Sequence, residues 1–229
     1  ISTESTLDAG DGGKFEFKQG GTANGTINAE NATFKIGAAY AVSGTLKTNS
    51  NTTWELGNSN LDLSSGILEI GGTVTLDNIL TNDQTIFKLS QNTTATRNSG
   101  FTLGGLNLEG NTLTIGSATT HLTLKDEYWF ENGSLAMGGG TLTLNGGGVK
   151  SGGELNLSNS ILAISGKFQN DGGTLTTSGT TLSLKGNTPL GNGGPLTFAT
   201  YEPNGWGLKL IDSTTHLTLA GDVLLQPND

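Results

Sequence analysis

Three consecutive aromatic residues, Tyr128, Trp129 and Phe130, occur in a chain whose aromatic content is only 6%. Exposed aromatic rings bind sugar faces and protein partners, because they offer a large apolar surface at a low entropic cost. A second pair, Tyr201 and Trp206, lies in a region that holds three of the four prolines. We predict that these five side chains bind ligand. The alternative for each group is that the rings fold back and seal a corner of the fold.

Residue types that act on polysaccharides are present but scattered. Arg97 is the single arginine, and it lies in an Asn- and Thr-rich segment with no acidic residue nearby in sequence. A lyase needs a basic residue beside acidic calcium ligands, and a hydrolase needs paired carboxylates. The tightest acidic cluster, Asp126, Glu127 and Glu131, is better explained as a solvated segment. We therefore predict no catalytic residue and no enzymatic activity.

Metal ligands are also not predicted. His121 and His216 occupy the same position in two copies of Thr-Thr-His-Leu-Thr-Leu. Two histidines can form a metal site or an acid–base pair, but nothing in the sequence brings a third ligand close to them. Asp8 and Asp11 beside two glycines resemble a calcium-binding turn in a single copy, without the repeated Gly-Gly-x-Gly-x-Asp pattern. The prediction is no metal and no cofactor.

The elements that must position these residues are short strands that recur every twenty residues. Leu142, Leu162 and Leu182 occupy equivalent positions, and apolar residues alternate with polar ones around them, as in Thr141-Leu142-Thr143-Leu144. This alternation gives a strand one buried face. Short strands on one fixed period indicate the turns of a solenoid, which stack and bury a continuous core. The same period is visible at Phe34, Trp54 and Val74.

The predicted fold is a single all-β domain over residues 1–229, a right-handed parallel β-helix of about 20 residues per turn. Three segments break the repeat and are predicted as irregular loops: residues 77–100, 125–133 and 186–207. Only 33% of the residues are apolar, which suits a narrow solenoid with one inward row per strand. Gly and Asn suit corners that require positive φ. We interpret the chain as a mature product or a piece of a longer protein.

Charge and composition exclude several partners. The net charge is −9 and Lys plus Arg total 11, so the chain lacks the basic face that nucleic-acid phosphates require. The same acidity disfavours anionic membranes, and no apolar run is long enough to span a bilayer, so membrane insertion is not predicted. There is no cysteine, which excludes disulfides and thiol chemistry.

The segments 139–146 and 172–179 read Gly-Gly-Thr-Leu-Thr-Leu-Asn-Gly and Gly-Gly-Thr-Leu-Thr-Thr-Ser-Gly. They resemble the passenger repeats of bacterial autotransporters and the coils of filamentous-haemagglutinin-type exoproteins. In those families this pattern marks a strand of a right-handed parallel β-helix. The resemblance covers residues 103–186 well and 20–76 loosely. It implies exposure at the bacterial cell surface and adhesion.

The function predicted from these observations is that of a non-enzymatic extracellular adhesin or passenger domain. Loops on a rigid rod would bind a surface glycan or a protein ligand. A self-assembling filament subunit is a second hypothesis, because the ends of a solenoid expose unpaired strand edges that allow homo-assembly. A third is a polysaccharide-active β-helix or an ice-binding β-helix. Outward threonine pairs such as Thr141 and Thr143 suggest the ice-binding form.

Overall fold

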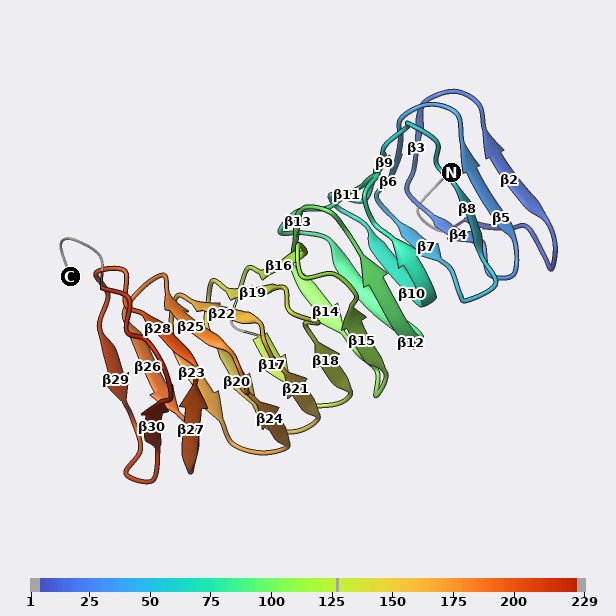
Figure 1. The fold of residues 1–229 in the computed structure, drawn as a ribbon. Coiled ribbons are helices and arrows are strands. Elements are labelled where there is room, and N and C mark those ends of the chain that lie inside the picture. The colour runs from blue at the N-terminus through green and yellow to red at the C-terminus, as the bar shows by residue number, and fades with distance from the viewer. Residues whose placement is uncertain (1–4, 127, 226–229) are drawn as a thin grey trace. The chain divides into compact units, whose positions relative to one another are not determined.

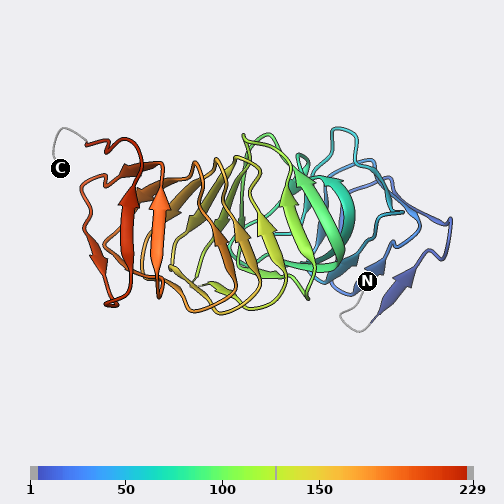
Figure 2. The same cartoon turned by 60° about the horizontal axis from the view of Figure 1, so that its bottom comes forward.

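The computed structural model describes residues 5–126 and 128–225, and its secondary structure in these ranges consists of β-strands joined by turns. The chain divides into two compact units, residues 1–97 with 101–113 (unit 1) and residues 98–100 with 114–229 (unit 2). Each unit is a stack of parallel β-solenoid turns (Figures 1 and 2). This confirms the predicted all-β parallel solenoid of about 20 residues per turn. The right-handed winding stays a prediction.

The described strands of unit 1 pair in parallel sheets that each receive strands from successive turns. One sheet has the order β1 (Thr6–Asp8), β4 (Thr26–Asn28), β7 (Thr45–Lys47), β10 (Ile67–Thr75) and β12 (Ile86–Thr96), and β14 (Gly105–Asn107) also pairs with β12. A second has the order β2 (Lys14–Phe17), β5 (Thr33–Ile36) and β8 (Thr53–Glu55). A third has the order β3 (Gly21–Ala23), β6 (Tyr40–Val42), β9 (Leu61–Asp62) and β11 (Ile79–Leu80).

The described strands of unit 2 follow the same plan. One sheet has the order β16 (His121–Leu124), β19 (Thr141–Leu144), β22 (Ile161–Ile164), β25 (Thr181–Leu184) and β28 (Thr200–Glu202). A second has the order β17 (Tyr128–Phe130), β20 (Gly148–Lys150), β23 (Phe168–Asn170), β26 (Thr188–Gly191) and β29 (Leu208–Leu210). The strands β18 (Ser134–Ala136), β21 (Glu154–Asn156) and β24 (Thr174–Thr176) pair in that order, and β27 (Pro195–Phe198) pairs with β30 (His216–Leu219). Two further strands, β13 (Gly100–Leu103) and β15 (Thr112–Ile115), each have residues assigned to both units.

The register of the strands places equivalent residues of successive turns directly over one another. Leu142 pairs with Leu162, and Leu162 pairs with Leu182, so the offset of twenty residues seen in the sequence is the length of one turn. All three leucines are 0% exposed. Each leucine of such a column contributes about 1.5–3 kcal/mol by leaving water, so the columns are the core of unit 2.

Irregularities within strands and corners between them require backbone conformations that few residues adopt. Gly72 lies within β10 and has a φ of +80° at an irregularity in the pairing of this strand with β12. A Cβ at Gly72 would lie 2.5 Å from the backbone Cα of Ser50, so no larger residue fits. Asn31 lies at a corner with a φ of 55°, and its carboxamide accepts hydrogen bonds from Asn49 and Asn51 at 3.0 and 2.9 Å. Asparagine thus supports the corners, as the composition indicated.

The three segments predicted as irregular loops contain paired strands instead. Residues 77–100 include β11 and β12, residues 125–133 include β17, and residues 186–207 include β26, β27 and β28. In β12 the buried positions hold Phe87 and Leu89 and then Thr93 and Ala95, whose short side chains hide the apolar alternation in the second half of the strand. In the second segment Phe130 shares its register position with Lys150 rather than with another apolar residue. Backbone pairing therefore continues where the side-chain pattern is weak.

If stacked leucine columns form the core (the column model), neighbouring positions of one sheet should differ sharply in their contribution to the free energy of unfolding. Replacing Leu162 with Ala should lower the free energy of unfolding by about 2–5 kcal/mol, because the stacked turns cannot close the cavity. Replacing Thr143, whose side chain lies on the other face of β19, with Ala should cost under about 1 kcal/mol. Urea unfolding followed by circular dichroism measures both. Equal losses for the two variants would contradict the column model.

Candidate functional site

The aromatic triplet is part of a sheet of unit 2. Residues 128–130 form β17, which pairs in parallel with β20. Phe130 is 2% exposed, and its ring packs edge-to-face against Tyr128 with centroids 4.4 Å apart. The side chain of Trp129 and the whole of Glu127 lie outside the described residues. The prediction that the triplet exposes its rings is wrong for Phe130, because alternation along a strand turns Phe130 and Tyr128 to the same face.

Burial changes the acid–base behaviour of Tyr128. The pKa of its phenol lies well above the ordinary value, first because burial penalises the phenolate and second because the Glu131 carboxylate repels it. The phenol therefore stays neutral at alkaline pH values at which an exposed tyrosine ionises. Tyr128 acts as a packing residue of the solenoid rather than as an exposed binding ring.

Tyr201 and Trp206 have different environments, although both were predicted to bind ligand. Tyr201 lies in β28 at the register position of Leu182, so it extends an interior column and is only partly exposed. Trp206 is 46% exposed at the turn between β28 and β29. Trp206 is thus the member of the predicted set whose described side chain is most open to solvent, and it defines the candidate binding corner.

The turn that carries Trp206 is short and well anchored. The backbone N–H of Trp206 donates to the carbonyl of Pro203 at 2.9 Å, and Asn204 and Gly205 have φ values of 52° and 79°. Two successive residues with positive φ, placed between the acceptor and the donor of such a hydrogen bond, are typical of a type I′ turn. The side-chain amide of Asn204 also donates to Ser183 Oγ at 3.0 Å and to the Leu184 carbonyl at 3.1 Å. These bonds fix the turn to the preceding solenoid turn, so the indole is presented from a rigid base.

A shallow groove of about 320 Å³ begins beside this turn. Its walls come from two paired strands, β26 and β29, in which Pro189 is in register with Lys209. Gly207, the residue after Trp206, donates its N–H to Asn187 Oδ1 at 3.0 Å at the mouth of the groove. The lining residues are Asn187, Thr188, Pro189, Gly207, Leu208 and Lys209. An apolar floor with one carboxamide and one ammonium group suits a polar ligand with an apolar face.

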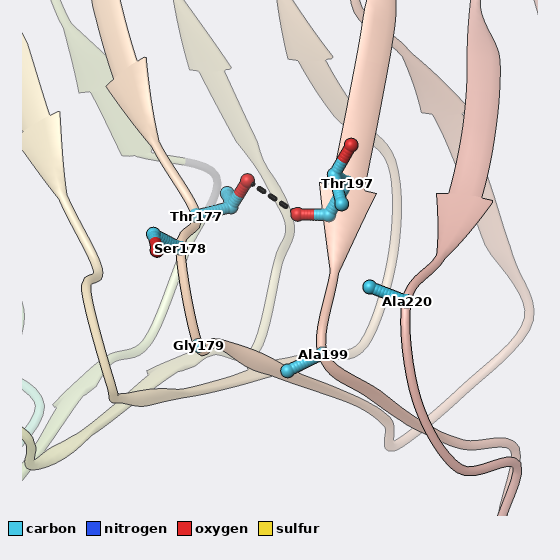
Figure 3. A pocket seen from close by; sticks show the side chains of 6 residues that line it. All are labelled: Thr177, Ser178, Gly179, Thr197, Ala199 and Ala220. Atoms are coloured by element: carbon cyan, nitrogen blue, oxygen red, sulfur yellow. Dashed lines mark hydrogen bonds between the residues drawn. The ribbon is translucent and has the colours of Figure 1, made fainter.

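Another cavity, of about 380 Å³, lies where the sheet that ends in β24 meets the turn that carries β27 (Figure 3). The hydroxyl of Thr177 donates to the carbonyl of Thr197 at 2.7 Å across the gap (Figure 3). The other lining side chains are short: Ser178, Gly179, Ala199 and Ala220. This cavity lacks aromatic and charged walls, so it offers shape but little chemical selectivity.

Lys150 is buried in the interior of unit 2 and was not singled out by its sequence pattern. Its ammonium donates to three backbone carbonyls, those of Gly152 at 2.9 Å, Gly153 at 3.1 Å and Gly172 at 2.6 Å. Burial lowers its pKa from the ordinary value. The three hydrogen bonds satisfy carbonyls at two successive corners, so the role of Lys150 is structural.

The remaining candidates for chemistry are dispersed. His121 and His216 are both exposed, but they lie in β16 and β30, which belong to different sheets. The guanidinium of Arg97 donates to the Ile79 carbonyl at 2.8 Å and lies 5.8 Å from the ring centre of Phe101. Within residues 5–126 and 128–225, no three His, Cys, Asp or Glu side chains gather closely enough to hold a metal ion.

The acidic residues of the first turn also form hydrogen bonds within the fold. Asp8 accepts the N–H of Gly10 at 2.8 Å and the amide of Asn28 at 3.1 Å. Asp11 accepts the amide of Asn31 at 2.9 Å. These carboxylates therefore support corners of unit 1, which gives the aspartate–glycine pattern a structural role.

Comparison with protein-family models, with curated proteins and with solved structures finds no significant match to this chain. The fold and the side-chain geometry are thus the basis for the functional proposal.

The raised pKa of Tyr128 predicts a specific loss of stability in alkali. The unfolded chain releases the phenolic proton near pH 10, whereas the folded chain retains it, so the free energy of unfolding should fall as the pH rises above 10. Tyr128→Phe removes the ionisable phenol and should flatten the dependence of the free energy of unfolding on pH above pH 10. Urea unfolding at pH 8 to 11 tests the difference between the two proteins. An identical alkaline slope would contradict the burial of the phenol.

Proposed function

We propose that the chain is a non-enzymatic extracellular adhesin or passenger domain that binds glycans through the Trp206 corner of unit 2. The observation that carries the proposal is the exposed indole on a type I′ turn that two hydrogen bonds of Asn204 fix to the preceding solenoid turn. Because the backbone of the turn is already fixed, no loop has to be ordered when a sugar ring stacks on the indole. The adjoining groove adds hydrogen-bonding groups from Asn187 and Lys209.

The repeats support the cellular setting of this proposal. The Gly-Gly-Thr-Leu segments that resemble autotransporter and filamentous-haemagglutinin repeats form corners and strands of the unit 2 solenoid, as the resemblance implies. A chain without cysteine whose stability comes from repeated local stacking suits export in an unfolded state and folding outside the cell. We therefore propose a bacterial cell-surface location.

Adhesion accounts for the described side chains better than an enzymatic or an ice-binding function. Arg97, the residue a lyase would use, is engaged with a backbone carbonyl and lies near the ring of Phe101. The outward row expected for ice binding is mixed, because Thr141 is followed in register by Ile161 and then by Thr181. A flat ice surface needs a more uniform array, whereas a single corner is enough to hold a sugar.

The proposal predicts that Trp206→Ala lowers glycan binding on an array of neutral and acidic saccharides by roughly tenfold or more, because stacking is lost. The melting temperature should change little, since the side chain is exposed. Ile161→Ala is the matched control, because Ile161 is also exposed (39%) but lies in β22, two strands away from β28 in the same sheet. Unchanged binding by Trp206→Ala, or binding only to protein ligands, would contradict a glycan site at this corner.

A second candidate, homo-assembly, is favoured by the apolar surface of residues 208–225. Within the described part of unit 2, β29 and β30 are the outermost strands of their sheets, and each pairs on one side. The exposed apolar side chains of this surface are Leu210, Ile211, Val223, Leu224 and Leu225. Open strand edges and exposed apolar groups together favour association with another solenoid turn.

Assembly through this surface predicts that Leu210→Lys reduces self-association of the purified chain. The charge would be buried without a partner if the edge of β29 were covered. Static light scattering over a range of concentrations measures the effect, and Ile161→Lys is a control on a strand that pairs on both sides. A strictly monomeric parent chain would exclude the assembly function.

A further inference from the structure

A cavity in unit 1 lies where strand pairing stops. In the part of the chain that the structure describes, β8 is the last strand of the sheet β2-β5-β8, whereas Thr73–Thr75 of the following turn belong to β10 and pair with β12. At this break the surface is hollowed by a cavity of about 230 Å³. Its lining residues are Trp54, Leu56, Gly57, Thr75, Asp77 and Asn78.

One wall of this cavity is an aromatic ring held in place by the core. Trp54 is in register with Phe34, and the two rings meet edge-to-face with centroids 5.9 Å apart. Trp54 is half-buried, whereas Phe34 is 0% exposed, so the indole is supported from the interior and open towards the cavity. Such a supported ring offers a flat apolar surface without an entropic penalty for ordering it.

The cavity is also lined by polar groups. Asp77 and Thr75 are exposed. The amide of Asn78 donates to the carbonyl of Gly57 at 2.8 Å, which fixes the orientation of the carboxamide. A carboxylate, a hydroxyl and an oriented carboxamide in one cavity with an indole are the groups that hold the hydroxyls and the apolar face of a sugar ring.

We propose that this cavity is a second saccharide-binding site, which takes one ring of a neutral glycan. Its volume is below the roughly 300–1,000 Å³ typical of pockets for drug-sized ligands, so it admits a single sugar ring rather than an oligosaccharide. The net charge of −9 disfavours uronic and sialic acids, whereas the charge of Asp77 itself is opposed by the guanidinium of Arg97. The site lies in unit 1 and uses no residue of the Trp206 corner, so it does not rest on the function proposed above.

Two such sites on one chain have a functional consequence. A glycan that presents several neutral rings can engage unit 1 and unit 2 through separate weak contacts, and the second contact then forms at a high effective concentration. Avidity of this kind allows shallow sites of low individual affinity to hold a chain on a polysaccharide surface.

The test isolates the unit 1 site in a full-length Trp206→Ala background. Methyl glycosides of glucose, galactose and mannose, N-acetylglucosamine and glucuronic acid are titrated against the ¹⁵N-labelled protein. The indole N–H signal of Trp54 is assigned by Trp54→Phe, which keeps an aromatic ring against Phe34. The expected result is that at least one neutral sugar shifts this signal in a saturable way, whereas glucuronic acid does not.

A pair of matched variants links the signal to the cavity. Thr75→Arg places a long side chain in the cavity from an exposed position and should weaken sugar binding by roughly tenfold or more without touching the core. Thr73→Arg adds the same charge on the same face of β10, two residues away and outside the cavity, and should leave binding unchanged.

Three outcomes would overturn the proposal: no neutral sugar shifts the Trp54 signal, glucuronic acid binds as well as the neutral sugars, or Thr75→Arg and Thr73→Arg behave alike. The outcome also separates the two proposals. Saturable binding at Trp54 together with unchanged array binding by Trp206→Ala would contradict only the proposed site at the Trp206 corner. Loss of array binding by Trp206→Ala without any sugar binding at Trp54 would contradict only the proposed unit 1 site.

Discussion

The constraint on which both units depend is parallel, in-register pairing of the backbone between successive turns. Pairing aligns each residue with its equivalent about one turn later, as Leu142 is aligned with Leu162 and Leu182. An inward side chain is therefore covered by the residues at the same position in the turns above and below it, rather than by a separate layer of structure. This is why a chain with 33% apolar residues forms a continuous core. It also explains how a column can accept Lys150 between Phe130 and Asn170, since nearby corner carbonyls satisfy the ammonium.

The same constraint explains where two of the cavities lie. Paired strands sit about 4.8 Å apart, which leaves no room for a ligand between turns. The cavity beside Thr177 lies where the sheet of β24 stops, next to a strand that begins with Pro195, a residue without a backbone N–H to donate. The cavity beside Trp54 lies where the sheet of β8 stops. Space for recognition inside a solenoid thus depends on local interruption of its hydrogen-bonded ladder.

Corners provide the other kind of surface. A corner residue is free of the alternation that turns every second strand residue inwards, so a large ring such as that of Trp206 stays exposed without disturbing the core. The turn beneath it is nevertheless rigid, because Asn204 is hydrogen-bonded to the preceding solenoid turn. Rigid presentation of a few exposed groups by a repetitive scaffold is the physical basis of the adhesin proposal.

The amino-acid sequence by itself determined the architecture: strands, their inward faces and the length of a turn follow from alternation and a period of twenty residues, which are local patterns. It did not determine which aromatic rings are open to solvent. Phe130 and Trp206 look equally available in the sequence, but one follows a strand into the core and the other occupies a turn. The second half of β12 was also hidden, because Thr93 and Ala95 fill its inward positions with short side chains. Trp54 became a wall of a cavity only through the interruption next to β8. Exposure depends on what the neighbouring turn places against a residue, and that neighbour is set by tertiary register rather than by the residue's own position in the repeat.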